Sequence, residues 1–174
     1  LGASIRRGSD EGETMNSYGG NMMGYRQEET FLAGGGADSV YAGWGNDTLE
    51  GGRGNDYLEG GTENDTYVFN LGDGNDTIYD YEYSFTGGKS DRIVFGEGVK
   101  AEDVVLERSG NHLIIHYSEN DSVTIQDAYA YGDGRTFVES FEFADGTKIA
   151  ADAEITLEAN PDSAGDPVFL KKLR

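Results

Sequence analysis

One large apolar residue recurs every nine positions in the middle of the chain, and each stands at the centre of a three-residue segment. The four residues are Val40, Leu49, Leu58 and Tyr67. Because side chains alternate across a β-strand, Leu49 would point to one face of residues 48–50 and its two neighbours to the other. The period therefore predicts a series of very short strands, each giving one side chain to a shared core.

Glycine-rich turns separate these expected strands, and each turn ends in an aspartate. Glycine is at the second position of four successive turns, at Gly34, Gly43, Gly52 and Gly61. It is also at the fourth position of three of them, at Gly36, Gly45 and Gly54, before Glu63 interrupts the series. The closing aspartates are Asp38, Asp47, Asp56 and Asp65. Since glycine reaches positive φ at little cost, this composition predicts tight turns.

The repeat continues in weaker form on both sides. Residues 71–79 form a fifth unit after two additional residues, and Glu29 and Phe31 indicate a degenerate first unit without glycines. A fixed short period is typical of solenoids. Two repeats would complete one flattened coil, and coils would stack at a strand spacing of roughly 4.8 Å. The predicted fold is all-β, a parallel β-roll; the alternative is an array of glycine-rich turns in which each aspartate only caps backbone N–H groups.

Stacking would place Asp38 one coil away from Asp56, and Asp47 one coil away from Asp65. Two carboxylates at that separation repel each other unless a cation lies between them. Carboxylate oxygens together with turn carbonyls, without histidine or cysteine, suit Ca²⁺ better than zinc or copper, and Mg²⁺ demands a tighter octahedron. The sequence therefore predicts calcium sites between neighbouring coils.

Residues 33–79 resemble the RTX (repeats-in-toxin), haemolysin-type calcium-binding family, whose nonapeptide has these glycines and this aspartate. In that family, one ion is shared by two turns one coil apart. The second- and fourth-position carbonyls and the aspartate of one turn face the first- and third-position carbonyls and the aspartate of the other. The resemblance implies about two to four Ca²⁺ ions.

The resemblance also implies three sets of ligands. The first ion would be bound by Gly34, Gly36, Asp38, Gly51, Arg53 and Asp56. The second ion would be bound by Gly43, Gly45, Asp47, Gly60, Thr62 and Asp65. The third, across the two-residue shift, would be bound by Gly52, Gly54, Asp56, Leu71, Asp73 and Asp76.

Four regions are expected: an N-terminal flank (1–23), the RTX β-roll (24–80), a β-rich capping segment (81–150) and a tail (151–174). The capping segment resembles the flank that follows the repeats in large RTX proteins. Residues 87–95 repeat the motif weakly, and strands are predicted within 103–108, 112–117, 122–127 and 137–143, with a hairpin turn at 144–147. The apolar residues expected to extend and close the core are Val105, Ile114, Val123, Ile125 and Phe143. Alternating Tyr79, Tyr81 and Tyr83 are expected to seal the junction.

Composition narrows the class of partner. The net charge is −20, with 33 acidic and 13 basic residues, which disfavours binding to nucleic acid or to anionic lipid. There are no cysteines, so disulfides contribute nothing. No stretch has the length of a transmembrane segment, so stable membrane insertion is not expected, and residues 1–15 lack the apolar region of a signal peptide.

Catalytic motifs are missing from this sequence, and the chain is not expected to be an enzyme. It contains neither HExxH nor GxSxG. His112 and His116 would lie about 13 Å apart on a strand, too far for one zinc ion. Asp166-Pro167 is similar to the bond cut by self-processing modules of some RTX proteins, although a plain flexible tail is preferred. Residues 168–174 could form a short helix or mark a truncation point.

These observations predict a bacterial calcium-binding module that is disordered without Ca²⁺ and folds when it binds the ion. By family resemblance, it would serve type I secretion and the extracellular folding of a larger toxin, adhesin or exoprotein. Its location would be secreted, extracellular or at the cell surface. The alternatives are a calcium-stiffened adhesin or partner-binding module with an unidentified host or surface ligand, and a noncatalytic or Asp-Pro self-processing part of a secreted enzyme.

Overall fold

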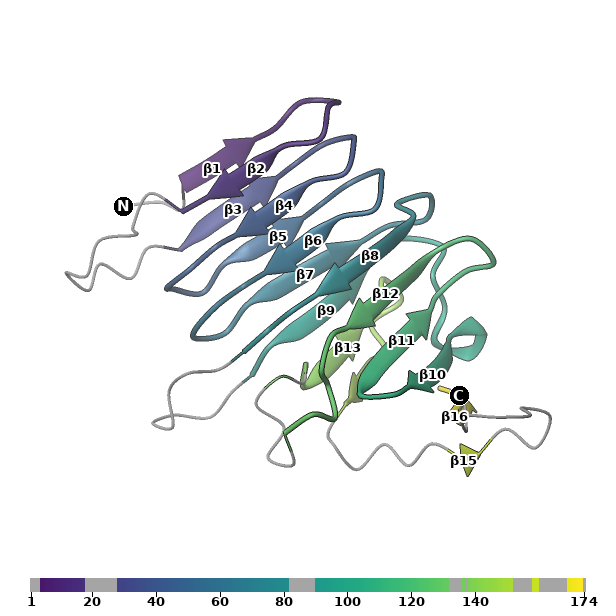
Figure 1. The fold of residues 1–174 in the computed structure, drawn as a ribbon. Helices are drawn as coiled ribbons and strands as arrows, with labels where there is room; N and C mark the ends of the chain where they lie inside the picture. The colour runs from purple at the N-terminus through teal and green to yellow at the C-terminus, as the bar shows by residue number, and fades with distance from the viewer. Residues whose placement is uncertain are drawn as a thin grey trace.

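Two β-sheets face each other across a shared core (Figure 1). The computed structural model describes residues 4–17, 28–81, 90–131, 136, 138–151, 158–159 and 169–173. In spatial order, the first sheet contains β1 (Ser4–Arg7), β3 (Glu29–Leu32), β5 (Thr48–Glu50), β7 (Thr66–Phe69), β9 (Arg92–Phe95), β13 (Ser140–Glu142) and β14 (Lys148–Ala150). The second, in spatial order, contains β15 (Glu158–Ala159), β16 (Phe169–Lys172), β10 (Val105–Ser109), β11 (His112–His116), β12 (Ser122–Ile125), β8 (Asn75–Ile78), β6 (Tyr57–Glu59), β4 (Ser39–Tyr41) and β2 (Thr14–Asn16). A single-turn 3₁₀ helix, η1 (Ala101–Asp103), precedes β10.

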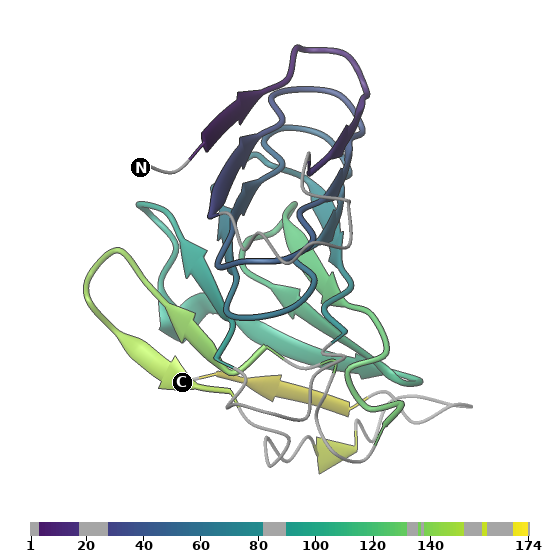
Figure 2. The same ribbon diagram turned by 90° about the vertical axis from the view of Figure 1, so that its left-hand side faces the viewer.

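From β3 to β9 the chain alternates between the two sheets, so that each pair of strands makes one coil (Figure 2). All neighbouring strands in this region pair in parallel. In the first sheet, Leu49 is in register with Phe31 and Tyr67, and in the second sheet Leu58 is in register with Val40. These side chains are fully buried. The predicted parallel β-roll and its four inward-facing residues are therefore confirmed.

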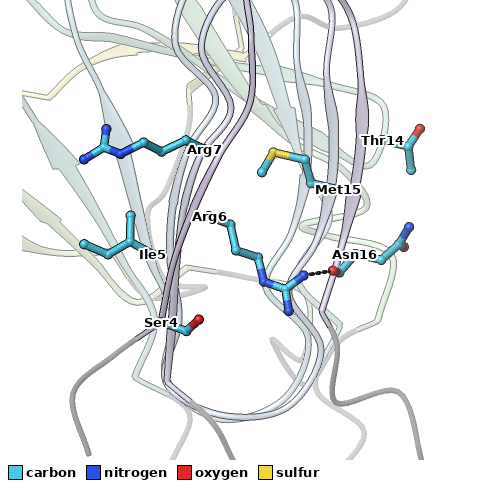
Figure 3. Close-up of a pocket in the computed structure, with 7 residues that line it drawn as sticks. All are labelled: Ser4, Ile5, Arg6, Arg7, Thr14, Met15 and Asn16. Carbon is cyan, nitrogen blue, oxygen red and sulfur yellow. Dashed lines mark hydrogen bonds between the residues drawn. The ribbon is translucent and has the colours of Figure 1, made fainter.

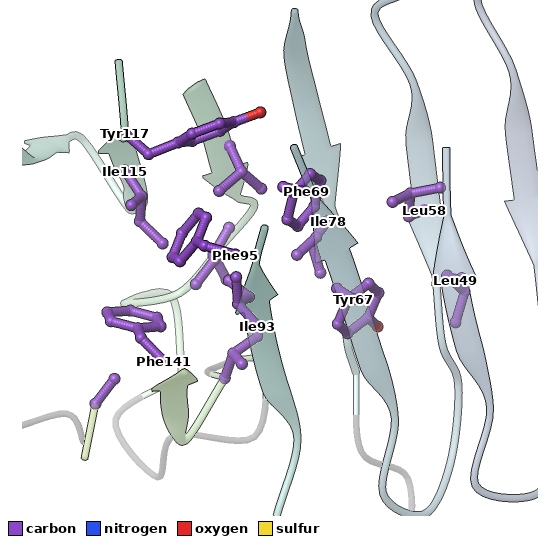
Figure 4. Close-up of a cluster of buried hydrophobic side chains, with 14 of the residues drawn as sticks. Leu49, Leu58, Tyr67, Phe69, Ile78, Ile93, Phe95, Ile115, Tyr117 and Phe141 are labelled. Carbon is purple, nitrogen blue, oxygen red and sulfur yellow. The ribbon is translucent and has the colours of Figure 1, made fainter. Parts of the chain in front are cut away.

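The apolar side chains of successive coils form one continuous core (Figure 4). In the middle of the roll the inward positions hold aliphatic residues, whereas aromatic residues gather toward the cap. The ring of Phe95 lies 5.1 Å from both Tyr117 and Phe143, centroid to centroid, and Phe69 lies 6.5 Å from Phe95. Burying such side chains contributes about 1.5–3 kcal/mol each, so the core gives the coils a reason to stack even before any ion is considered.

The cap adds one more coil to the roll before its strands reverse direction. β12 pairs in parallel with β8, and β13 pairs in parallel with β9. β10, β11 and β12 then form an antiparallel meander, and β14 pairs antiparallel with β13. The turn at 144–147 is the expected hairpin, with Gly146 at φ 92° and the Thr147 N–H donating to Asp145 at 2.9 Å. The β-rich cap is confirmed.

For two of the residues expected to close the core, the prediction is wrong, because their side chains lie outside it. Val105 and Ile114 are only half-buried. Val123, Ile125 and Phe143 are buried as predicted. The core positions of β10, β11 and the residues beside them are Val104, Leu106, Leu113 and Ile115. In both strands apolar residues occupy adjacent positions, so alternation alone does not show which face is inward.

The predictions for the alternating tyrosines and for the C-terminal tail have different outcomes. Tyr79 and Tyr81 stack at 6.3 Å, and Tyr81 meets Tyr131 edge-on at 5.5 Å; all are half-buried or exposed. Tyr83 and the Asp166-Pro167 bond lie outside the described residues. The short helix expected at 168–174 is wrong, because β16 pairs antiparallel with β10. A free strand edge favours an added strand over an isolated helical turn. Among the described residues, no helix has the length and apolar character needed to cross a membrane.

The sheets begin earlier than the predicted repeat region. β1 and β2 lie within the expected flank 1–23 and pair in parallel with β3 and β4. Arg6 stands opposite Phe31 and Met15 opposite Val40, at positions that are apolar in later coils. The Arg6 guanidinium lies 5.5 Å from the Phe31 ring centre, binds Glu29 at 3.3 Å and donates to the backbone carbonyl of Asn16 (Figure 3). A cation therefore covers this end of the core. The domain boundaries themselves stay a prediction.

We expect Arg6→Ala to destabilise the folded protein by about 2 kcal/mol, because it removes a cation–π contact and the ion pair with the buried Glu29 carboxylate. Arg7→Ala is the control, since Arg7 is the exposed neighbour and its loss should change stability by less than about 0.5 kcal/mol. Urea unfolding in saturating Ca²⁺ measures both. Equal losses would contradict a capping role for Arg6.

We expect Gly61→Ala to be more destabilising than Gly72→Ala by at least about 1 kcal/mol. Both glycines have positive φ, 94° and 91°, so both substitutions carry the same backbone strain. Only at Gly61 would the new Cβ meet another coil, 2.0 Å from the Gly43 carbonyl oxygen, whereas Gly72 faces open space. Urea unfolding in calcium gives the two free energies. Similar losses of unfolding free energy in the two variants would contradict a tight contact between neighbouring coils at Gly61.

Candidate metal centre

The turns of the roll gather along its two edges and place acidic side chains in two columns. The first acidic column consists of Asp38, Asp56 and Asp76. The second acidic column consists of Asp47, Asp65 and Asp91, and begins beside Glu29. All of these carboxylates are at most 3% exposed. The predicted facing pairs, Asp38 with Asp56 and Asp47 with Asp65, are therefore neighbours in the structure.

One oxygen of each carboxylate binds a backbone N–H of the preceding coil. The Asp38 N–H donates to Asp56 Oδ1 at 2.9 Å, and the Asp56 N–H donates to Asp76 Oδ1 at 2.8 Å. On the other edge the Asp47 N–H donates to Asp65 Oδ1 at 2.9 Å. The aspartates thus cap backbone groups, as the turn-array alternative required, but this uses only half of each carboxylate.

The other oxygen is the feature that points to a cation. In Asp38, Asp47, Asp56 and Asp65, the Oδ2 atom is buried and has no hydrogen-bond partner among the described residues. A buried carboxylate oxygen without a partner costs several kcal/mol. Four such atoms in register are difficult to explain unless positive charge fills the space beside them. Because the available donors are oxygens, the group that fits is a hard divalent cation such as Ca²⁺.

The glycines keep the same space open. A Cβ on Gly51 would lie 2.3 Å from Asp56 Oδ2, and a Cβ on Gly60 would lie 2.3 Å from Asp65 Oδ2. A Cβ on Gly52 would lie 2.0 Å from the Gly34 carbonyl oxygen of the adjacent coil. The first-position glycine therefore borders the unpartnered oxygen, and the second-position glycine allows carbonyl oxygens of the neighbouring turn to approach.

The structure brings each predicted ligand set together across neighbouring coils. In the first set the Arg53 N–H donates to the Gly34 carbonyl at 3.0 Å, and in the second the Thr62 N–H donates to the Gly43 carbonyl at 3.0 Å. In the third set the Gly54 N–H donates to the Asp73 carbonyl at 3.0 Å. The remaining members belong to the same turns, namely Gly36, Gly45, Gly52, Leu71 and Asp76. Their coordination of an ion stays a prediction.

Glu63 keeps the turn shape although it replaces a glycine. Its φ is 77°, in the left-handed region that the fourth-position glycines occupy, such as Gly54 at 120°. Few residues with a side chain adopt this conformation, so the surrounding coils impose it on Glu63. The interruption of the glycine pattern therefore does not interrupt the roll.

Burial raises the pKa of several column carboxylates. The pKa of Asp47 is raised to about 7, mainly by burial and further by the charges of Glu29 and Glu63. Burial likewise raises the pKa of Asp56 to about 6, and the charge of Asp38 raises it further. Burial raises the pKa of Asp76 to about 8, and the charge of Asp56 raises it further. The charged forms are therefore unfavourable when no cation is bound.

Asp121 is a buried carboxylate of the same fold whose two oxygens both accept hydrogen bonds. It is buried in the cap, which by itself would raise its pKa, but the N–H groups of Gly72 and Gly74 and the Ser118 hydroxyl together lower it. Their distances to the carboxylate are 3.0, 2.9 and 2.6 Å. Asp121 thus anchors the cap to the last turn of the repeats by hydrogen bonds alone, unlike the column aspartates.

Sequence reasoning missed two features of the edges. The residue before the aspartate forms its own ladder, in which the Asn64 N–H donates to Asn46 Oδ1 and the Asn75 N–H donates to Asn55 Oδ1, both at 2.9 Å. The recurring Asn-Asp pair could have signalled it. Secondly, Asp80 joins Asp65 and Asp91 in a buried cluster whose ligand atoms lie within 4.8 Å of one another. Asp80 has no counterpart in the repeat, so its role was not visible.

Two family profiles match the chain. Residues 24–58, 32–67 and 50–79 match the RTX calcium-binding nonapeptide repeat (4 copies). Residues 112–153 match the haemolysin-type calcium binding protein related domain. The chain therefore carries RTX haemolysin-type calcium-binding repeats followed by a related domain, which confirms the resemblance drawn from the glycines and aspartates.

This chain is similar in sequence to one known protein and in structure to another, among other matches. It is 44% identical over 69 residues to the iron-regulated protein FrpA of Neisseria meningitidis serogroup C, an alignment that covers 40% of this chain and 6% of that protein. The solution structure of the AlgE6R3 subunit from the Azotobacter vinelandii mannuronan C5-epimerase matches with a TM-score of 0.51 and 26% identity. That match covers 92% of this chain and 93% of the AlgE6R3 chain, which supports the β-roll fold.

We expect the metal-free protein to lose stability as pH rises from 5 to 8. The folded-state pKa values of Asp56, Asp47 and Asp76 are raised to about 6, 7 and 8. A carboxyl with a raised pKa favours the folded state at low pH, and this contribution is lost as pH passes through the folded-state value. In saturating Ca²⁺ the slope should be flat or reversed, because the ion competes with protons.

Two measurements from pH 5 to pH 8 test this difference: the far-UV β signal of the metal-free protein, and the urea unfolding midpoint in saturating Ca²⁺. Metal-free protein that becomes more stable as pH rises would contradict the assignment of raised pKa values to the acidic columns.

Proposed function

Because the chain carries RTX calcium-binding repeats, we propose that it is a module of a larger secreted bacterial protein that folds when it binds calcium outside the cell. The observation that supports this most is that the buried Oδ2 atoms of four column aspartates have no hydrogen-bond partner among the described residues, namely those of Asp38, Asp47, Asp56 and Asp65. Each predicted ion would lie between two coils, bound by the three ligand sets given above. About two to four ions would be bound in total.

The energetics favour coupling between folding and metal binding. Without an ion, the folded chain has to bury rows of carboxylates in a protein of net charge −20, and the 27 glycines lose much conformational entropy when the turns form. With the ion, each carboxylate gains a favourable partner. Since the site does not exist in an unfolded chain, the free energy of binding becomes free energy of folding.

This coupling fits a route from a low-calcium to a high-calcium compartment. Extracellular modules bind Ca²⁺ at about 10⁻⁴–10⁻³ M, far above the concentrations that intracellular buffers bind. The chain would stay open in the cytosol, pass through a type I secretion machinery, and fold on emergence. The partners would be Ca²⁺ and that machinery, and the location would be extracellular or at the cell surface.

The parent protein could be an enzyme whose catalytic centre lies in another part of it. The match to a subunit of a mannuronan C5-epimerase favours this second candidate. The chain itself contains neither HExxH nor GxSxG, and we propose a noncatalytic role for it. An adhesin module, with a recognition surface on residues 81–149, is a further alternative for the parent.

Calcium titration of the metal-free protein tests the proposal. We expect far-UV circular dichroism and the hydrodynamic radius to change together from an expanded chain to a compact β-protein, with a midpoint of about 10⁻⁴–10⁻³ M Ca²⁺. Mg²⁺ at the same concentration should not replace Ca²⁺. Asp56→Asn should raise the midpoint, because Asp56 belongs to two predicted ligand sets, whereas Asp103→Asn at an exposed position should not. A full β signal and a compact radius in metal-free buffer at pH 8 would refute calcium-dependent folding.

A further inference from the structure

Three buried aspartates meet where the roll joins the cap. Asp65 ends the turn before β7, Asp80 follows β8, and Asp91 precedes β9. All three are at most 1% exposed, and they offer ligand oxygens within 4.8 Å of one another. Two ligands of one Ca²⁺ ion, each 2.3–2.6 Å from the metal, can be separated by at most about twice that distance, so the three oxygens fit around a single ion.

This cluster is built differently from the sites predicted within the repeats. The Tyr79 N–H donates to the Leu58 carbonyl, so Asp80 stacks on Gly60, the first position of the preceding turn. In the predicted sets that position supplies only a backbone carbonyl. Asp80 supplies a carboxylate instead, and the cluster therefore has three formal negative charges where a pair of repeats has two.

A buried tyrosine holds this arrangement in place. The Gly60 N–H donates to Tyr67 Oη at 2.8 Å, and the Tyr67 hydroxyl donates to Asp80 Oδ2 at 2.5 Å. Tyr67 occupies an inward position of the repeat, where Leu49 and Leu58 have no polar atom. Exchanging an aliphatic residue for tyrosine gives this coil a hydroxyl that fixes the Asp80 carboxylate.

A second observation concerns the Asp65 carboxylate. Asp65 Oδ1 accepts the Asp47 N–H, but Asp65 Oδ2 is buried with no hydrogen-bond partner in the part of the chain that the structure describes. A Cβ on Gly60 would lie 2.3 Å from this oxygen and 2.5 Å from Tyr67 Oη, so both atoms border the same small space. Burial, followed by the charge of Asp80, raises the pKa of Asp65.

We propose that Asp65, Asp80 and Asp91 bind one Ca²⁺ ion at the junction between roll and cap, in addition to the ions between the repeats. Three carboxylates without histidine or cysteine suit Ca²⁺ rather than zinc or copper. Tyr67 is a positioning residue that orients Asp80 through its hydroxyl. The proposal rests on the proposed function only in that both require the chain to bind calcium.

The ion would tie the repeats to the cap. β9 begins directly after Asp91 and pairs with β7 on one side and with the cap strand β13 on the other. The Asp91 N–H also donates to Glu139 Oε2 at 2.7 Å, just before β13. An ion that fixes Asp91 against Asp65 and Asp80 would therefore set the register in which the cap continues the first sheet.

Equilibrium dialysis with Ca²⁺ on the full chain tests the site, with Asp80→Asn as the variant and Asp103→Asn as the charge-matched control at an exposed position. We expect Asp80→Asn to bind one ion fewer than the wild type, or to bind one ion at least about 10-fold more weakly, and Asp103→Asn to match the wild type. Asp80→Asn should also lower the melting temperature in saturating Ca²⁺. If the cluster held no ion, the same variant would relieve repulsion between carboxylates and would leave the melting temperature unchanged or raise it.

Tyr67→Phe keeps the test decisive if Asp80→Asn does not fold. Loss of an orienting hydrogen bond should weaken one calcium affinity about 10- to 100-fold. Loss of a purely structural hydroxyl would instead weaken all the calcium affinities to a similar extent, because binding and folding are coupled. Unchanged ion number and affinities in the variants would overturn the junction site while leaving the proposed function intact, provided that the wild type binds calcium. A wild type that binds no calcium would overturn both.

Discussion

The structure depends on one electrostatic constraint, which is that carboxylates are buried in rows and stacked one coil apart. In four of them, the described residues leave one oxygen without a hydrogen bond. Hydrogen bonds between coils, such as that from the Asp38 N–H to Asp56, account for one oxygen of each aspartate. The Oδ2 atoms of Asp38, Asp47, Asp56 and Asp65 are buried and have no partner in the part of the chain that the structure describes. The fold therefore has a hydrophobic core that favours stacking and charged edges that oppose it. A divalent cation bound between the carboxylates would make the contribution of the edges to the free energy of folding favourable.

Glycine makes this arrangement possible by geometry rather than by flexibility alone. Gly52 and Gly61 approach carbonyl oxygens of the adjacent coil so closely that a methyl group would collide with them. Gly51 and Gly60 leave space beside the unpartnered carboxylate oxygens. The same residues that cost conformational entropy in the folded state thus create the oxygen-lined gaps. This explains why stability and ion binding are expected to be coupled in this chain.

Much of the roll could be predicted from the sequence, because a nine-residue period determines strand length, inward position and coil stacking together. Leu49 and Leu58 are buried where the period placed them. Arg6 could not be assigned in this way, since a charged residue stands at an apolar position of the repeat and only the packed end of the core explains it. Val105 and Ile114 were placed on the wrong face because apolar neighbours hide the alternation.

The candidate site was predicted in part. The facing pairs Asp38–Asp56 and Asp47–Asp65 follow from the period, and the structure places them side by side. Asp80 lies beside Asp65 and Asp91 although it has no counterpart in the repeat, and no spacing in the sequence shows that contact. The asparagine ladder was visible as a pattern but had no evident purpose until the coils were stacked.

Location of bound metal is the most direct test of the central claim. In crystals grown in millimolar Ca²⁺, we expect anomalous calcium peaks on both edges of the roll, between Asp38 and Asp56 and between Asp47 and Asp65, each within 2.3–2.6 Å of carboxylate and carbonyl oxygens. A well-ordered roll with no metal at either position, and with the Oδ2 atoms bound only to water, would contradict it.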